Sequence, residues 1–87
     1  MRRRVVISGR VQGVFFRDSL RRLAEERGVA GWARNTPEGT VEAVFEGDPD
    51  DVERLVSFAR RGPRDARVDD VRVLEEAAEG LAGFSIR

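Results

Sequence analysis

The sequence lacks several residue types on which enzymes and metalloproteins commonly depend. Its 87 residues include no histidine, cysteine, tyrosine or lysine. These absences exclude thiol and imidazole nucleophiles, serine–histidine–aspartate triads, Schiff-base lysines, disulfides and the usual zinc sites. Any chemistry must therefore depend on arginine, carboxylates, hydroxyls, amides and backbone N–H groups.

An excess of charge of one sign and long hydrophobic runs are also missing. The sixteen basic residues, all arginine, are balanced by sixteen acidic residues. Proteins held to nucleic acid by their overall field carry a net positive charge, so this balance argues against a nucleic-acid partner, although it leaves room for a local basic patch. No apolar run could cross a membrane or act as a leader. We expect one cytoplasmic domain over residues 1–87, monomeric because no long apolar stripe is left over.

The segments that are present alternate between strand and helix patterns. Phe16, Leu20, Leu23 and Ala24 form an amphipathic helical stripe that ends at Gly28. A second helix is predicted to begin after Asp48, with Pro49 in its first turn, and to end at Gly62-Pro63. Strands are predicted from apolar alternation or β-branched runs over residues 3–8, 30–34, 41–46, 66–75 and, as a short closing strand, 83–87.

This order predicts an α+β fold, the ferredoxin-like βαββαβ sandwich. We expect an antiparallel sheet of four to five strands with two helices on one face. The first two strands are joined by a helix and so run parallel, which places their C-terminal ends at the same edge of the sheet. The loop that begins at Gly9 and the side chain of Asn35 should therefore be neighbours.

The loop between the first strand and the first helix is the clearest candidate site. Gly9 and Gly13 lie four residues apart before a helix, so consecutive N–H groups can curl around an anion at the positive helix end. The pattern is neither a Walker loop nor the dinucleotide fingerprint, and by itself it also fits a plain tight turn.

Two polar side chains accompany this loop. Arg17 lies in the first helical turn, where the helix dipole disfavours a cation, and a bound anion would offset that cost. The chain has sixteen arginines, so the position of Arg17 also fits chance placement. Asp18 could be an ordinary helix-start acid or a partner of that guanidinium. Asn35 by itself fits a turn starter, and only the topology brings it toward the loop.

Other features are predicted to be structural. The aromatic residues should pack in the core or on the sheet, Gln12 should be a polar loop residue, and no base is available to activate a serine. Residues 2–4 are interpreted as a solvated strand end and residues 75–80 as a solvated connection.

Two stretches resemble the signatures of the acylphosphatase family. Residues 9–17, GRVQGVFFR, look like the first signature, and residues 31–35, GWARN, followed by Gly39, Val41 and Gly47, look like the second. The resemblance extends over nearly the whole chain, to the closing Phe84-Ser85-Ile86. Leu20 stands where many relatives have threonine, a departure that touches no expected catalytic atom.

The resemblance implies an enzyme that hydrolyses small-molecule acyl phosphates to a carboxylate and inorganic phosphate without metal or cofactor. It implies that Arg17 binds the phosphate and that Asn35 orients the attacking water. The phosphate cradle would be formed by the backbone of the loop residues Arg10, Val11, Gln12, Gly13 and Val14.

Two non-enzymatic functions are also compatible with the predicted fold. An anion sensor would use the same loop and release its ligand unchanged. An RNA-binding module would stack bases on exposed aromatics of the central strands, but the first strand has none and the third has only Phe45.

Overall fold

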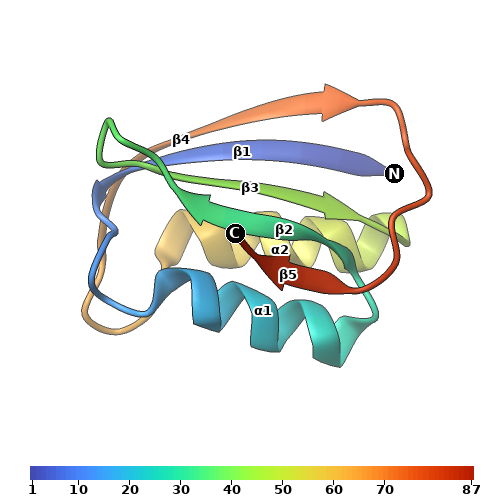
Figure 1. The fold of residues 1–87 in the computed structure, drawn as a ribbon, viewed down its shortest axis with the longest axis horizontal. Helices are drawn as coiled ribbons and strands as arrows, with labels where there is room; N and C mark the ends of the chain where they lie inside the picture. The colour runs from blue at the N-terminus through green and yellow to red at the C-terminus, as the bar shows by residue number, and fades with distance from the viewer.

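The chain forms one five-stranded sheet with both helices packed on the same face (Figure 1). The computed structural model describes residues 1–87. In chain order the elements are β1 (Arg2–Arg10), α1 (Phe16–Arg27), β2 (Ala30–Asn35), β3 (Val41–Glu46), α2 (Pro49–Arg61), β4 (Arg67–Glu76) and β5 (Phe84–Ile86). Neither helix is long and apolar enough to span a membrane.

The strand order β4-β1-β3-β2-β5 confirms the predicted ferredoxin-like arrangement. Both β1 and β2 pair antiparallel with β3, so they run parallel to each other on either side of it. One detail differs from the expected antiparallel sheet, because β5 pairs parallel with β2. The connection after β4 returns along the end of the sheet where β2 begins, so β5 enters in the direction of β2 (Figure 1).

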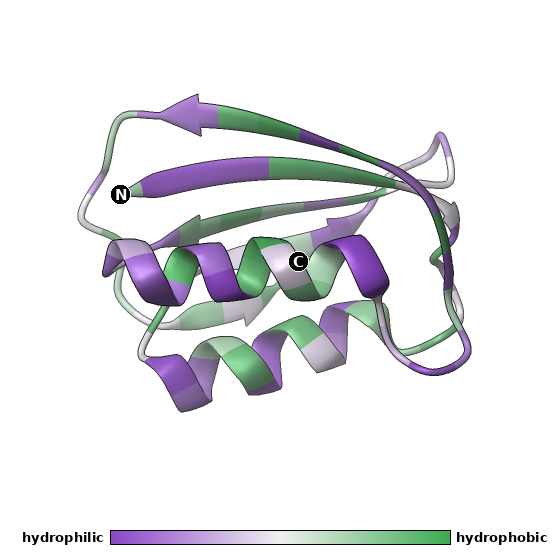
Figure 2. Ribbon diagram, turned by 180° about the vertical axis from the view of Figure 1, so that it is seen from behind, coloured by the Kyte–Doolittle hydropathy of each residue, from purple (hydrophilic) through white to green (hydrophobic).

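The hydrophobic core lies between the sheet and the two helices. Its largest fully buried side chains include Phe16 and Leu20 of α1, Leu55 of α2, and Ile7 and Phe45 of the sheet. Along each helix hydrophobic segments alternate with hydrophilic ones, as expected for helices with one buried side (Figure 2). The accessible surface of 5070 Å² agrees with the roughly 5,200 Å² that the size scaling gives for this mass.

The two helices begin in different ways. Asp48 caps α2 as predicted, because its carboxylate accepts a hydrogen bond of 3.0 Å from the N–H of Asp50, and Pro49 follows in the first turn. In contrast, Phe15 precedes α1 in a left-handed conformation, with φ of 60°, and its side chain caps no N–H group. The first N–H groups of α1 are therefore left without a capping side chain.

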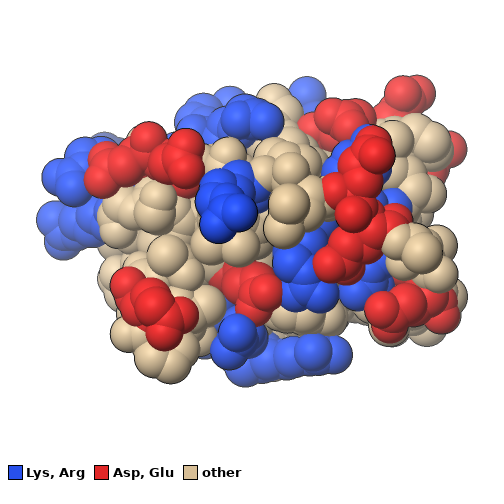
Figure 3. Space-filling model, turned by 90° about the horizontal axis from the view of Figure 1, so that it is seen from above, with Lys and Arg blue, Asp and Glu red and all other residues tan.

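The interpretation of residues 2–4 as a solvated strand end is wrong for Arg2 and Arg4. Arg2 is only 3% exposed on the helix-free face of the sheet, where it contacts Glu46 at 3.3 Å and Glu76 at 2.8 Å. Arg4 likewise contacts Glu76 at 2.6 Å. The acids lie across from these arginines because the register pairs Arg2 with both Glu46 and Glu76. Seen from above, acidic and basic groups lie close together over much of the surface (Figure 3).

The only tryptophan lies on the same face and offers no exposed stacking surface. Trp32 is 7% exposed, and the guanidinium carbons of Arg4 and Arg87 lie 5.4 and 4.4 Å from its ring centroid. Two cations thus occupy the aromatic surface that a base would need.

The expected solvated connection after β4 is also held more firmly than predicted. The buried carboxylate of Glu46 accepts hydrogen bonds from the N–H groups of Glu79, Gly80 and Leu81, at 2.8 to 2.9 Å. The bond from Glu79 contributes most to lowering the pKa of Glu46, whereas burial opposes it by favouring the neutral acid. Glu46 therefore links β3 to the segment that leads into β5.

We expect Glu46→Gln to lower the melting temperature at neutral pH and to flatten its dependence on pH. A carboxylate whose pKa is lower in the folded state stabilises the fold above its unfolded pKa, about 4.3, and this stability is lost as the pH falls through the folded value. Thermal melts between pH 2 and 7 measure both effects. An unchanged pH profile in the variant would show that Glu46 does not couple folding to protonation.

Candidate functional site

A cleft opens where the C-terminal ends of β1 and β2 meet the start of α1. Its volume is about 220 Å³. Both Arg17 and Asn35 line it, although they are 18 residues apart in the chain. The complete lining consists of Val11, Gly13, Phe15, Phe16, Arg17, Asp18, Asn35 and Ile86. The parallel course of β1 and β2 thus brings the predicted loop, arginine and asparagine to one place.

The loop over residues 11–15 is anchored by two side chains that are buried in the hydrophobic core. Val11 and Val14 are buried members of the hydrophobic core. Gly13 has φ of 75° and open space where a β-carbon would lie, so the chain can turn there with its backbone uncovered. No backbone N–H group of residues 11–15 donates a hydrogen bond within the protein. The loop therefore presents unpartnered donors, which an anion can accept.

Gly9 positions this loop relative to β4. The pairing of β1 with β4 shifts register between Ser8 and Gly9. At Gly9 φ is 126°, and a β-carbon would collide with the backbone oxygen of Arg67. Only glycine permits this approach, and the resulting irregularity lies directly before the loop.

Gln12 does more than the polar loop residue that we predicted. Its side-chain amide donates to the backbone oxygens of Thr36 and Thr40, at 2.9 and 3.0 Å. These two carbonyls belong to the turn between β2 and β3 that follows Asn35. Gln12 therefore ties the loop to the strand end that carries the asparagine.

Arg17 is half-buried in the first turn of α1 and is unpaired. Its guanidinium takes part in no hydrogen bond and no ion pair within the protein. Asp18 does not hold it, because the carboxylate of Asp18 pairs with Arg21 and, at 3.0 Å, with Arg22. A free cation thus lies where the helix dipole already attracts negative charge.

Asn35 does not form the turn that follows it. In the turn, the N–H of Thr36 donates to the backbone oxygen of Thr40 at 2.9 Å, the N–H of Gly39 donates to the oxygen of Thr36 at 3.1 Å, and the two threonine hydroxyls lie 2.6 Å apart. The Oδ1 atom of Asn35 is instead buried and without a hydrogen-bond partner. Because buried polar atoms are nearly always satisfied, this acceptor is suited to a donor that is not part of the chain.

The remaining predicted loop residues take different positions. Arg10 is the exposed last residue of β1, paired with Arg67, and the side chains of Gln12 and Val14 do not line the cleft.

Four residues that line the cleft were not predicted from the sequence: Phe15, Phe16, Asp18 and Ile86. The expectation that Phe15 packs in the core is wrong, since it is 80% exposed. The one sequence signal that Phe15 could line the cleft was its position directly before the start of a helix.

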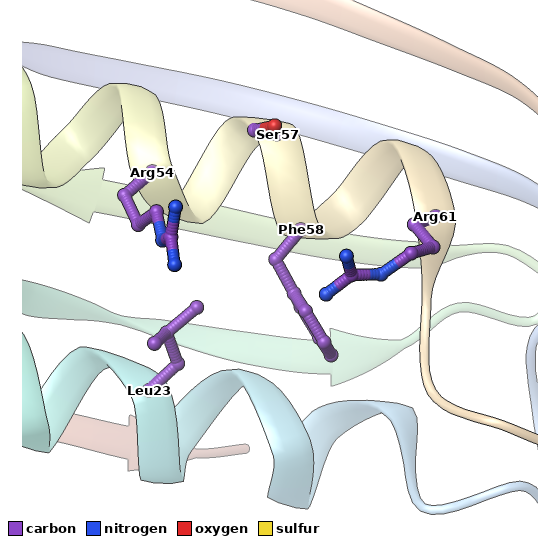
Figure 4. A pocket seen from close by; sticks show the side chains of 5 residues that line it. All are labelled: Leu23, Arg54, Ser57, Phe58 and Arg61. Carbon is purple, nitrogen blue, oxygen red and sulfur yellow. The ribbon is translucent and has the colours of Figure 1, made fainter.

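A second hollow lies between α1 and α2 (Figure 4). It has a volume of about 260 Å³ and is lined by Leu23, Arg54, Ser57, Phe58 and Arg61. The guanidinium of Arg61 lies against the ring of Phe58, 5.5 Å from its centroid. Helical hydrogen bonds already occupy the backbone N–H groups there, so this hollow lacks the donors of the loop. No group of three or more acidic, histidine or cysteine side chains is placed to hold a metal ion.

The fold and the cleft together define a class of small α+β proteins that can surround an anion with loop amides, a helix start and an arginine. The comparisons with known proteins agree with this class and narrow it. The family model for acylphosphatase matches residues 3–86. The chain therefore belongs to the acylphosphatase family, whose members are hydrolases acting on acyl phosphates.

Individual relatives match along almost the whole chain. The acylphosphatase of Rubrobacter xylanophilus is 59% identical over 85 residues, which cover 97% of this chain and 77% of that protein. The acylphosphatase of Thermococcus kodakarensis is 58% identical over 80 residues, which cover 92% and 88%. The solved structure of an acylphosphatase from Coxiella burnetii superimposes with a TM-score of 0.94 at 40% identity, covering 99% of this chain and 90% of that one.

Proposed function

We propose that residues 1–87 form one catalytic domain in which the cleft hydrolyses an acyl phosphate without metal or cofactor. One observation carries this proposal. The unpaired guanidinium of Arg17, the unpartnered Oδ1 of Asn35 and the free N–H groups of the loop all meet at a single cleft. Each of these groups lacks a partner in the protein, and a phosphoryl group with an attacking water would satisfy all of them.

The phosphoryl group would be bound by donors from two sources. Arg17 offers two parallel N–H groups that match two phosphoryl oxygens. Backbone N–H groups from Arg10 through Val14 would form the cradle around the phosphoryl oxygens, and those of residues 11–14 have no other acceptor. The uncapped start of α1 adds its dipole.

Hydrolysis then requires little acid–base chemistry. The leaving group is a carboxylate whose conjugate acid has a pKa of about 4 to 5, by analogy with Asp and Glu, so no general acid is needed. The transition state is loose and places charge on the equatorial oxygens, which the arginine and the amides hold. Asn35 orients the water for in-line attack, the bond to the acyl oxygen breaks, and the proton of the water passes to the phosphate itself.

The same reasoning limits the substrate range. An alkyl phosphate ester would release a strongly basic alkoxide. The only carboxyl group in the cleft, that of Asp18, is paired with Arg21 and Arg22, so no side chain is free to protonate the alkoxide. We therefore propose a small-molecule acyl phosphate as the substrate. We also propose that the enzyme is monomeric and cytoplasmic and that it acts without nucleic acid or membrane.

The test is phosphate release from a simple acyl phosphate by the purified protein, with and without a chelator. We expect turnover that the chelator leaves unchanged, and no turnover of a simple alkyl phosphate. Turnover that disappears with the chelator would contradict metal independence. Saturable binding without phosphate release would instead support the anion sensor.

A further inference from the structure

The cleft has an apolar side that phosphate binding does not use. Phe15 is 80% exposed and Ile86 is 37% exposed, and both line the cleft beside the buried side chains of Val11 and Phe16. The only charged residues in the lining are Arg17 and Asp18, and Asp18 is already paired with Arg21 and Arg22. The cleft thus combines one polar end with one apolar wall.

Phe15 is unfavourable for the fold in two independent ways. It exposes a large apolar ring, and it holds a left-handed backbone conformation that glycine or asparagine adopts far more readily. Neither a capping hydrogen bond nor core packing compensates for it. Strained residues of this kind are concentrated at sites that contact ligands, and Phe15 lies two residues before Arg17.

Ile86 is held in place by β5. It pairs with Ala33 of β2, and the N–H of Arg87 donates to the oxygen of Ala33 at 2.8 Å. Two residues earlier on the same side of the strand, Phe84 packs against the core and stacks on Phe45 with ring centroids 6.2 Å apart. The chain therefore fixes Ile86 at the rim while leaving its side chain partly open.

We propose that Phe15 and Ile86 form the binding surface for the acyl group and make the enzyme prefer aromatic or branched apolar acyl phosphates over small ones. This inference rests on the proposed function, because the acyl group is the part of the substrate that remains outside the phosphate cradle. A flat apolar group between these side chains would remove both of them from water, whereas an acetyl group would reach little of either surface.

The experiment compares kcat/KM for benzoyl phosphate with that for acetyl phosphate in the wild type and in two separate variants. Phe15→Asn removes the ring but tolerates the left-handed backbone. Ile86→Thr shortens the side chain and makes it polar while keeping the branch at the β-carbon and the strand preference. We expect each change to lower the ratio of benzoyl to acetyl kcat/KM by roughly tenfold, as for the loss of one or two buried methylene contacts. Leu74→Ala is the matched control, because Leu74 is an exposed apolar residue of β4, at the opposite edge of the sheet.

Each outcome is decisive. A ratio that falls in both site variants but not in Leu74→Ala supports the acyl-binding surface. An unchanged ratio, or equal losses for both substrates in variants whose melting curves show a native fold, overturns it and leaves the proposed function intact. Failure of the wild type to hydrolyse either substrate would overturn the proposed function and this inference together.

Discussion

Arg17→Ala is expected to lower kcat with a simple acyl phosphate by at least about 10²- to 10³-fold, the loss typical of removing one transition-state donor. The guanidinium of Arg17 has no partner in the protein, so substrate is the partner it would lose. Arg17→Lys should restore little activity, because an ammonium group lacks the planar pair of donors that a phosphoryl group accepts. Steady-state kinetics of both variants measure this directly.

The stability of Arg17→Ala separates a binding role from a structural one. A cation in the first turn of α1 opposes the helix dipole, so its removal should leave the free energy of unfolding unchanged or raise it by roughly 0.3 to 1 kcal/mol. Arg54→Ala is the matched control, since Arg54 also makes no ion pair but lines the hollow between the helices. Near-normal turnover of Arg17→Ala, or an equal loss in Arg54→Ala, would exclude the proposed role of Arg17.

The parts of the fold that could be predicted are those that nearby residues determine. Asp48, Pro49 and Gly62 surround α2, and the structure places its ends where these residues predict them. The parallel direction of β1 and β2 followed from the helix between them, so the meeting of Asn35 with the loop was also predictable.

Two of the features that the sequence did not reveal depend on pairing between distant strands, and a third depends on an unusual backbone conformation. Arg2 and Glu76 are 74 residues apart, and only the strand register shows that they are partners. Ile86 reaches the cleft because β5 pairs with β2, which no local pattern indicates. The outward position of Phe15 depends on a left-handed residue before α1, where an aromatic residue is not expected. With Phe15 and Ile86, the structure adds an apolar wall to the predicted phosphate site.

Asn35→Ala is expected to lower kcat to a similar extent, about 10²- to 10³-fold, while changing KM much less than Arg17→Ala does. The reason is that Asn35 is proposed to hold the attacking water, whereas Arg17 holds the substrate in both the ground state and the transition state. The stability of the fold should not fall, because Oδ1 is buried without a partner and its removal relieves a desolvation cost on the order of 1 kcal/mol.

Arg34→Gln serves as the control for Asn35→Ala, since Arg34 is the neighbouring residue of β2 but pairs with Glu42, on the helix-free face. A rise in KM with unchanged kcat in Asn35→Ala would show that the carboxamide binds substrate instead of orienting water, and a kcat close to that of the wild type would remove it from the mechanism.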